Sequence, residues 1–169
     1  DTRAGNHPRT IARDRYELVI IREADFSKDW DAIVDGMWDF VQFAGYADFV
    51  PSERNHFEAT MLELLRNPVF QVFLADDRGR PVAGIGVSQI PFLFNPELTM
   101  VEELFWWSTD QAPPSAAGRL LHHTVEWARQ SSGRNLLMMK RLSNSPEQLE
   151  QIYKRLGLSH VEISHMGVI

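Results

Sequence analysis

None of the 169 residues is cysteine, which excludes disulfide bonds, thiolate nucleophiles and cysteine-bound zinc. No apolar run approaches the ~20 residues that a transmembrane helix needs, so a membrane partner is excluded as well. No charged and then apolar leader precedes a cleavage site, and nothing in the sequence indicates secretion. We therefore expect a cytoplasmic protein.

The chain also lacks a surplus of basic residues. Lys and Arg number 17 against 23 Asp and Glu, and the net charge is −6. Binding along a phosphate backbone needs clustered cations, so plain duplex nucleic acid is disfavoured as a partner. A hydrophobic fraction of 44%, with 10 Phe, 5 Trp and 3 Tyr, excludes a wholly disordered chain and predicts a core of large side chains.

A chain of this length usually forms one domain. We expect a single domain over 16–169, preceded by a flexible arm at 1–15, where Gly, Asn and Pro occur without apolar periodicity. The arm is locally basic because it carries Arg3, Arg9, Arg13 and Arg15. A disordered terminus and a tether for an anionic substrate both suit this composition.

Apolar periodicity and turn residues predict both strands and helices. The expected strands span 16–22, 70–74, 81–90, 100–107 and 135–142, with one or two more in 158–169; the expected helices span 27–43, 52–65, 116–129 and 145–156. The order β-α-α-β-β-β-α-β-α-β is typical of an α/β (α+β) fold with a mixed, mostly antiparallel sheet. We expect six to seven strands, flanked by about four helices on the two faces.

Single residues predict several details of these elements. Ser27 is a candidate N-cap and Gly45 a candidate stop for the first helix. Apolar residues are expected to alternate along 70–74. Pro91 and Pro96 predict an irregular connector between the second and third of three antiparallel strands.

Several chemistries lack their motifs. The sequence has no Walker phosphate loop and no Gly-x-Ser-x-Gly nucleophile motif, and its Gly-Ile-Gly run at 84–86 lies inside an expected strand. His122 and His123 are adjacent on a helix and point in different directions. His160 and Glu162 would share a strand face but lack a third ligand. We therefore expect no bound metal.

The segment 100–129 carries the strongest functional signal. An expected strand ends in Glu103-Leu104-Phe105-Trp106-Trp107, a short loop follows, and Arg119-Leu120-Leu121 lies in the first turns of a helix. Such a junction directs free backbone N–H groups and the positive end of a helix dipole at one point. An anion is the natural occupant of that point.

Two further stretches extend this signal: the helix Arg119-Leu120-Leu121-His122-His123-Thr124-Val125-Glu126-Trp127-Ala128 and the late segment Ile152-Tyr153-Lys154-Arg155-Leu156-Gly157-Leu158. With the junction and the order of elements, they resemble the GCN5-related N-acetyltransferase (GNAT) superfamily. The helix is similar to the family's third helix, and the late segment resembles its Leu-Tyr-Glu-Lys-Leu-Gly-Phe signature. The resemblance runs from about Tyr16 to the C-terminus, and the Glu-Leu-Phe-Trp-Trp strand also looks like bacteriophage acetyltransferases.

The resemblance implies an acetyl-CoA donor and direct transfer of the acetyl group to an amine. Glu103 would be the base that deprotonates the amine, and Tyr153 the acid that protonates the departing thiolate. Such a base is needed because an alkyl amine with a pKa near ~10 is mostly protonated at pH 7. The residues implied to bind the coenzyme are Phe105, Trp106, Trp107, Ser108, Ser115, Ala116, Ala117, Gly118, Arg119 and Asn144.

Both catalytic assignments have a structural alternative. Tyr153 belongs to an apolar helical stripe, where a core role is common, together with Leu149, Ile152 and Leu156. For Glu103 the alternative is a solvated strand carboxylate. Its neighbour Glu102 points to the opposite face by strand parity and is disfavoured as the base.

The loop before the helix departs from the family pattern, which reads Arg or Gln, two residues, Gly, one residue, then Gly or Ala. This chain has Ala112-Pro113-Pro114-Ser115-Ala116-Ala117, in which the final alanine matches, or else Gln111 matches with one residue inserted. The glycines that let a backbone approach phosphate are absent, and two prolines donate no hydrogen bond. An alternative function therefore stays open: a GNAT-fold binding or regulatory protein with a degenerate coenzyme A site.

The acceptor is expected near the first two helices. There Trp38, Tyr46 and Asp48 combine aromatic and acidic side chains, which suit a cation. Core packing is the alternative, and it is favoured for Trp38. We expect a small-molecule or macromolecular amine, and the phage resemblance adds a modified nucleobase or a host protein. The oligomeric state stays open, with a homodimer as one alternative.

Overall fold

The computed structural model describes residues 19–50, 53–131, 134–140 and 147–161. The arm predicted at 1–15 lies outside these residues. In chain order the elements are β1 (Val19–Glu23), α2 (Phe26–Phe43), the 3₁₀ helix η1 (Ala47–Phe49), α3 (Arg54–Leu65), β2 (Phe70–Asp77), β3 (Arg80–Phe92), β4 (Asn95–Ser108), α4 (Ser115–Gln130), β5 (Arg134–Met138) and α5 (Glu147–Arg155).

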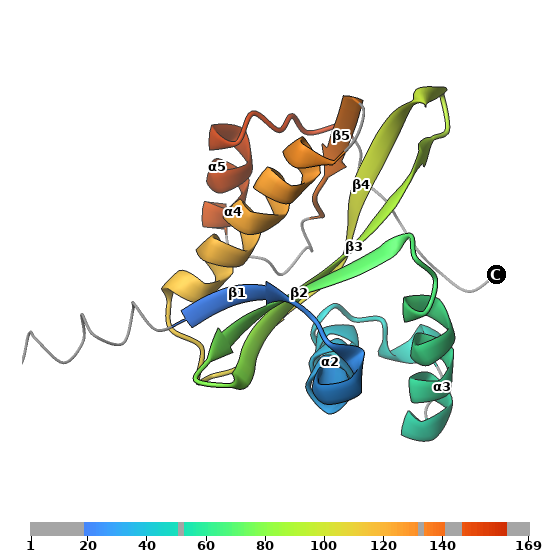
Figure 1. The fold of residues 1–169 in the computed structure, drawn as a ribbon, viewed down its shortest axis with the longest axis vertical. Coiled ribbons are helices and arrows are strands. Elements are labelled where there is room, and N and C mark those ends of the chain that lie inside the picture. Colours follow the sequence, from blue (N-terminus) through green and yellow to red (C-terminus); the bar gives the residue numbers. More distant parts are fainter. Residues whose placement is uncertain (1–18, 51–52, 132–133, 141–146, 162–169) are drawn as a thin grey trace, which may run out of the picture.

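The described strands form one sheet in the order β1-β2-β3-β4-β5. Neighbours among the first four pair antiparallel, and β5 pairs parallel with β4, as a crossover through α4 requires. Helices α2 and α3 lie on one side of the sheet and α4 and α5 on the other (Figure 1). The predicted mixed, mostly antiparallel α/β architecture is confirmed.

The predicted number of strands is not confirmed. The described residues form five strands where six to seven were expected. Residues 158–161 have no regular secondary structure, and the rest of the segment predicted to supply final strands lies outside the described residues.

Strand β2 corrects the predicted alternation between a buried and an exposed face. All of its residues from Val72 to Asp76 are buried. Alternate side chains enter two different cores, because Val72 and Leu74 face the α2 side and Phe73 and Ala75 the α4 side. A strand that is covered on both faces reads as a continuous apolar run, and residues 72–75 (Val-Phe-Leu-Ala) form such a run.

The connector predicted around Pro91 and Pro96 is wrong. Strand β3 continues to Phe92 and β4 begins at Asn95, so both prolines lie in a long hairpin that projects beyond the rest of the sheet (Figure 1). Pro91 still aligns with Thr99, and the register shifts between Pro91 and Phe92. Proline is tolerated at such an irregularity because no ladder hydrogen bond is required of its nitrogen there.

Helix α2 begins at Phe26, one residue before the predicted start. Asp25 is its N-cap, and the side chain of Asp25 accepts a hydrogen bond from the Ser27 N–H at 3.1 Å. Ser27 is therefore the donor to the cap and not the cap itself. Gly45 follows the helix with φ at +76°, which confirms the predicted stop because glycine adopts this conformation without strain.

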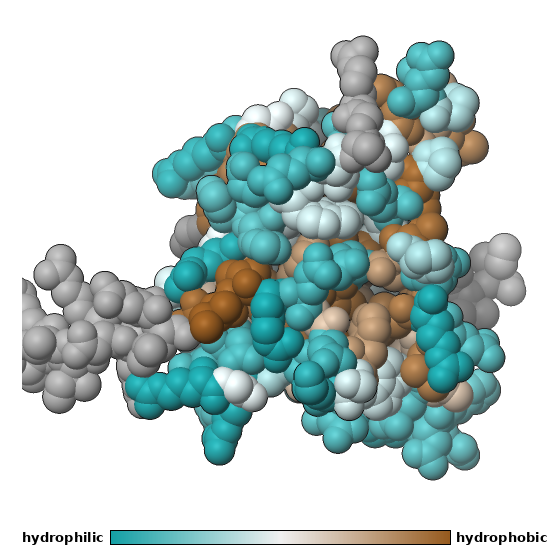
Figure 2. Space-filling model, in the orientation of Figure 1, coloured by the Kyte–Doolittle hydropathy of each residue, from teal (hydrophilic) through white to brown (hydrophobic). Residues whose placement is uncertain are grey.

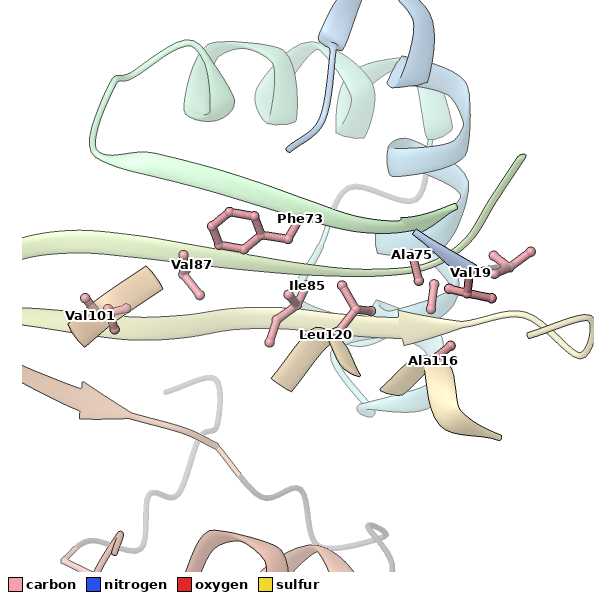
Figure 3. Close-up of a cluster of buried hydrophobic side chains, with 11 residues drawn as sticks. Val19, Phe73, Ala75, Ile85, Val87, Val101, Ala116 and Leu120 are labelled. Carbon is pink, nitrogen blue, oxygen red and sulfur yellow. The ribbon is translucent and has the colours of Figure 1, made fainter. Parts of the chain in front are cut away.

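Two hydrophobic cores fill the layers on either side of the sheet. Figure 3 shows the core on the α4 side, where side chains from four strands meet the helix; its labelled members are Val19, Phe73, Ala75, Ile85, Val87, Val101, Ala116 and Leu120. The core on the α2 side contains Ile33, Val34, Met37, Phe105 and Trp107. Together they hold β4 from both faces.

An ion-pair network fastens α2 to the edge of the sheet. Arg22 on β1 donates hydrogen bonds to Asp29 on α2 (2.6 and 2.9 Å) and to Asp76 on β2 (2.9 and 2.7 Å). Both carboxylates are buried. These hydrogen bonds lower the pKa of Asp29 and raise that of Arg22 above its ordinary value.

The surface is largely hydrophilic, with local apolar exceptions (Figure 2). Hydrophobic surface lies over β1, where Ile20 is 64% exposed. Leu93 and Phe94 at the hairpin tip are each 83% exposed. Among the described helices, none combines the length and the apolar character that crossing a bilayer demands.

Candidate active site

The site lies where β4 and β5 part. The two strands pair in parallel from Leu98 opposite Arg134 to Glu102 opposite Met138. Strand β4 then continues to Ser108 with no partner on its β5 side among the described residues. An unpaired strand edge exposes backbone donors and acceptors that an extended ligand can use.

A bulge at Leu104 separates the two halves of β4. Gly86 of β3 aligns with Phe105 and the next residue, Val87, aligns with Glu103, so Leu104 is the additional residue. Leu104 and Phe105 both join the core on the α2 side, while Trp106 packs on the α4 side. The bulge therefore removes Glu103 from the face that Phe105 and Trp107 share.

Glu103 is 4% exposed, so the alternative of a solvated carboxylate is wrong. Its Oε2 accepts a hydrogen bond from the backbone N–H of Lys140 at 3.0 Å. Burial raises the pKa of Glu103 to about 7, and the N–H and ammonium of Lys140 offset part of that effect. A carboxyl group with this pKa can accept a proton near neutral pH.

Tyr153 on α5 also contacts Lys140. Its hydroxyl donates a hydrogen bond to the Lys140 carbonyl at 3.0 Å. Burial, with the nearby charge of Glu103, raises the pKa of Tyr153 above its ordinary value. Tyr153 also packs against Leu121 and Val125. The two predicted catalytic residues are thus joined through the backbone of one residue, Lys140, and the tyrosine is part of the core as well.

Lys140 is the residue that the sequence did not indicate. Its ammonium makes an ion pair with Glu102 at 2.8 Å, and its backbone N–H and carbonyl contact Glu103 and Tyr153. The sequence shows only a lysine near the end of the strand expected over 135–142. Nothing in that pattern predicts which side chains its backbone groups meet.

The aromatic residues predicted to line the coenzyme face away from the open edge. Phe105 and Trp107 are buried in the core on the α2 side, and Trp106 is half-buried on the α4 side. Trp107 lies so close to Gly36 and Gly84 that a Cβ on either residue would meet its ring within 3.0 Å. Any contact of residues 105–107 with a coenzyme at this edge would use their backbone groups.

Helix α4 begins at the predicted phosphate junction with fewer donors than expected. Pro114 is the N-cap, so the helix proper starts at Ser115. A helix leaves its first N–H groups unpaired, but the Ala116 N–H already donates to the Pro113 carbonyl at 2.9 Å. Helix geometry leaves the Ser115 and Ala117 amides without an intrahelical acceptor, and no other acceptor for them is found among the described residues.

Two side chains and a glycine complete this junction. The Ser115 hydroxyl is buried and has no hydrogen-bond partner among the described residues. Arg119 is exposed on the first turn, and a Cβ added at Gly118 would meet nothing within 4 Å. These groups suit an anion. Asn144 lies outside the described residues, and Ser108 is exposed at the end of β4.

The three predicted acceptor residues lie on the α2 side of the sheet. Trp38 packs edge-on against Phe57 of α3, with ring centroids 5.1 Å apart, which favours the core interpretation. The rings of Tyr46 and Phe40 also pack edge-on, with their centroids 6.1 Å apart. Asp48 is exposed on η1. The structure does not bring these residues into contact with Glu103 or Tyr153.

The histidines show ordinary packing. His123 packs edge-on against Phe73, with ring centroids 4.8 Å apart, and His122 is exposed. Within the part of the chain that the structure describes, no three His, Asp or Glu side chains gather as metal ligands would.

Comparisons with known proteins identify the fold. No protein-family profile matches the chain, and no curated protein matches its sequence. Among solved structures, it is similar to a possible acetyltransferase from Clostridium difficile 630, at a TM-score of 0.68 and 13% identity over 90% of this chain and 99% of that one. A predicted acetyltransferase with acetyl-CoA from Clostridium acetobutylicum gives a TM-score of 0.65 and 14% identity, over 89% and 96% of the chains.

A third neighbour is an aminoglycoside acetyltransferase from an uncultured soil metagenomic sample, in complex with sisomicin. Its TM-score is 0.64 and its identity 12%, over 91% of this chain and 97% of that one. The chain therefore has the fold of the GCN5-related N-acetyltransferases, as its sequence motifs predicted. At these identities the likeness shows the fold alone.

Proposed function

We propose that the protein is an N-acetyltransferase that moves an acetyl group from acetyl-CoA to an amine. One observation carries the proposal: Glu103 and Tyr153 are buried and meet at Lys140, where β4 and β5 part. The fold, shared with several acetyltransferases, supports it. The proposal places the protein in the cytoplasm, with one catalytic domain over 16–169 behind an arm at 1–15.

The junction at α4 would hold the coenzyme. The Ser115 and Ala117 amides, the Ser115 hydroxyl and Arg119 suit its diphosphate, and the unpaired edge of β4 suits the amides of its extended arm. Acetyl-CoA would supply a thioester carbonyl as the electrophile and a thiolate as the leaving group. Gly118 leaves open space beside the first turn.

Glu103 would accept the proton that the amine loses, through a bridging water because the carboxylate is buried. As the new N–C bond forms and the C–S bond breaks, Tyr153 would give its hydroxyl proton to the departing sulfur. The Tyr153 hydroxyl donates to the Lys140 carbonyl in the present structure, so it would have to rotate away from that acceptor. The assistance is modest, because a thiol has a pKa near ~8.5.

The acceptor in this proposal is a small-molecule amine that enters beside α2 and η1. A neighbour bound to sisomicin, itself an aminoglycoside acetyltransferase, supports this class. Tyr46 and Asp48 would contact the cationic acceptor, while Trp38 supports α3. The alternative acceptor is a macromolecular amine, including a modified nucleobase. It is supported by the resemblance of the Glu-Leu-Phe-Trp-Trp strand to bacteriophage acetyltransferases.

A second candidate is a binding or regulatory protein that keeps the fold without transferase activity. Two observations favour it: neither Pro113 nor Pro114 has an N–H to donate, and the Ala116 N–H is already bonded to Pro113. Isothermal titration with acetyl-CoA separates the candidates. Binding in the micromolar range supports the enzyme, and no heat at millimolar ligand supports the second candidate.

Turnover of a panel of aminoglycosides and simple amines then tests the residue roles. Glu103→Gln should lower kcat by about 10²-fold, as loss of a general base does, and leave the affinity for acetyl-CoA unchanged. Tyr153→Phe should lower kcat less. Glu97→Gln, on the exposed part of the hairpin, is the matched control. Unchanged kcat in both catalytic variants would refute these assignments.

A further inference from the structure

We propose that Lys140 is the positioning residue of this site, with Glu102 as its anchor. The inference rests on the proposed function, because it takes Glu103 and Tyr153 as the proton-transfer groups. It assigns a role to two residues that touch neither the coenzyme edge nor the α4 junction. Each step of the argument is a contact of Lys140.

The first step concerns the two backbone polar groups of Lys140. Its N–H donates to Glu103 at 3.0 Å and its carbonyl accepts from the Tyr153 hydroxyl at 3.0 Å. A shift of this residue would therefore move both catalytic groups together. Because Glu103 is nearly inaccessible to water, no solvent molecule replaces the lost N–H at low cost.

The second step concerns how Lys140 itself is held. It lies two residues beyond Met138, where the register between β4 and β5 ends, so no ladder pair fixes it. Its ammonium instead bonds the Glu102 carboxylate at 2.8 Å. Glu102 is the last residue of β4 that pairs with β5. The ion pair therefore adds a contact just beyond the paired part of the two strands.

The third step concerns charge. The charged or titratable groups that face Glu103 among the described residues are Glu102 from β4, Lys140 after β5 and Tyr153 from α5. The Lys140 ammonium lowers the pKa of Glu103, and the Glu102 carboxylate raises it. Through charge alone, removal of the ammonium should raise the pKa of Glu103 and removal of the Glu102 carboxylate should lower it, whereas loss of the positioned Lys140 N–H should raise that pKa in both cases.

The test compares Lys140→Met, which keeps the peptide and most of the stem, with Glu102→Gln. Two readouts are measured on the full-length protein: the carboxyl titration of Glu103 by NMR with carbon-13-labelled glutamate, and the pH profile of kcat. We expect the titration midpoint and the acidic limb of kcat to move to higher pH in both variants, because each breaks the ion pair that holds the Lys140 N–H against Glu103. The kcat at pH 7 should fall about 10-fold in Lys140→Met with KM for acetyl-CoA unchanged, and Lys140→Arg should restore it.

Lys28→Met is the matched control, because Lys28 makes a comparable exposed pair with Asp25 at 2.7 Å on α2. It should move neither readout. A shift to lower pH in Glu102→Gln, which charge alone predicts, or no shift in the titration of either variant would overturn the proposal even if the wild-type protein is an active transferase. If the wild type transfers no acetyl group, the proposed function fails, while titration shifts to higher pH in both variants would still support the role of the pair.

Discussion

Glu103 places a carboxyl group almost out of contact with water and gives it one backbone donor. Removing water disfavours the ionised form, and one N–H with a nearby ammonium does not fully compensate. The same raised pKa that suits proton transfer near pH 7 also makes the ionised residue a cost to the folded state. The consequence is measurable without any substrate.

The stability of the wild-type protein should therefore fall as the pH rises. The pKa of Glu103 is about 7 in the folded chain against an ordinary value of 4.5, so the folded state binds this proton more tightly. Its stabilising contribution is complete below about pH 4.5 and is lost as the pH rises through 7. Between these limits the wild type should lose about 3 kcal/mol relative to Glu103→Gln in urea unfolding curves. Glu97→Gln should show no such difference, and parallel curves for the wild type and Glu103→Gln would contradict the assignment.

At this scale the sequence predicts Glu103 and Tyr153 as site residues but gives no signal for Lys140. The first two residues carry side chains whose type and position matched a motif. Lys140 acts through its backbone across 37 residues of sequence to Glu103, and a backbone group has no residue type to recognise. The burial of Glu103 was missed for a related reason, since its cover comes from β5 and α5.

The Trp107 ring lies between α2 and β3 and limits how closely α2 packs on the sheet. Its ring lies against Gly36 of α2 and Gly84 of β3, and a Cβ at either position would come within 3.0 Å of it. Both neighbours must therefore be glycine for the present packing. The indole N–H of Trp107 is buried with no partner among the described residues, so little besides packing holds the ring.

Gly36→Ala should destabilise the protein by about 1–3 kcal/mol, because the added methyl overlaps the Trp107 ring and overpacked cores cost that much. Gly118→Ala is the matched control, also inside a helix but facing open space, and it should be neutral or stabilising by up to about 1 kcal/mol. Thermal unfolding of the two variants measures the difference. An equal change in Tm would contradict the prediction, because it would mean that the Trp107 ring moves aside at little cost.

Removal of Arg22 should expose how strongly β1 and α2 depend on each other. Arg22→Met leaves the buried Asp29 and Asp76 without their cation, and breaking such a pair costs about 3 kcal/mol at pH 7. The pKa of Asp29 is lowered in the wild type, so its contribution is present above the ordinary pKa of 3.8 and is lost as the pH falls through the lower folded value. The variant should be less sensitive to acid, which chemical denaturation at pH 3 and 7 would measure. The triple variant with Asp29→Asn and Asp76→Asn should recover part of the loss.

The elements that the sequence predicted well are those with one dominant signal. Helix α4 matches its predicted span within one residue at each end, because its apolar stripe and the prolines before it agree. The hairpin of β3 and β4 was divided wrongly, since two prolines outweighed the apolar residues around them. The prolines are tolerated because the register shifts there. A register shift is a property of the pairing between β3 and β4 and cannot be read from the sequence of either strand alone.

At the scale of the whole molecule, the tip of the β3–β4 hairpin lies outside the hydrophobic cores. Leu93 and Phe94 are each 83% exposed. The double variant Leu93→Ser/Phe94→Ser should unfold within about 0.5 kcal/mol of the wild type, as exposed substitutions do. Unfolding curves test this, and sedimentation of both proteins reports whether the tip contributes to self-association. A large loss of stability would show that the tip is covered in solution.

The sequence also predicted the overall architecture, because the order of strands and helices admits few topologies. It did not predict where each strand buries its side chains. Strand β2 enters two cores and β4 changes sides at Leu104, and both facts follow from which helices cover each face. Which helix covers which face of a strand is decided only when the helices pack on the sheet.

The extra residue at Leu104 makes the length of β4 a fixed quantity. Deleting it would restore regular pairing with β3 and rotate one half of the strand relative to the other. Either Glu103 would then leave Lys140, or Phe105 and Trp107 would leave the packing beneath α2. Insertions and deletions should therefore be rejected in this strand and accepted at the exposed turn between β2 and β3, so that evolutionary drift in chain length is confined to exposed turns.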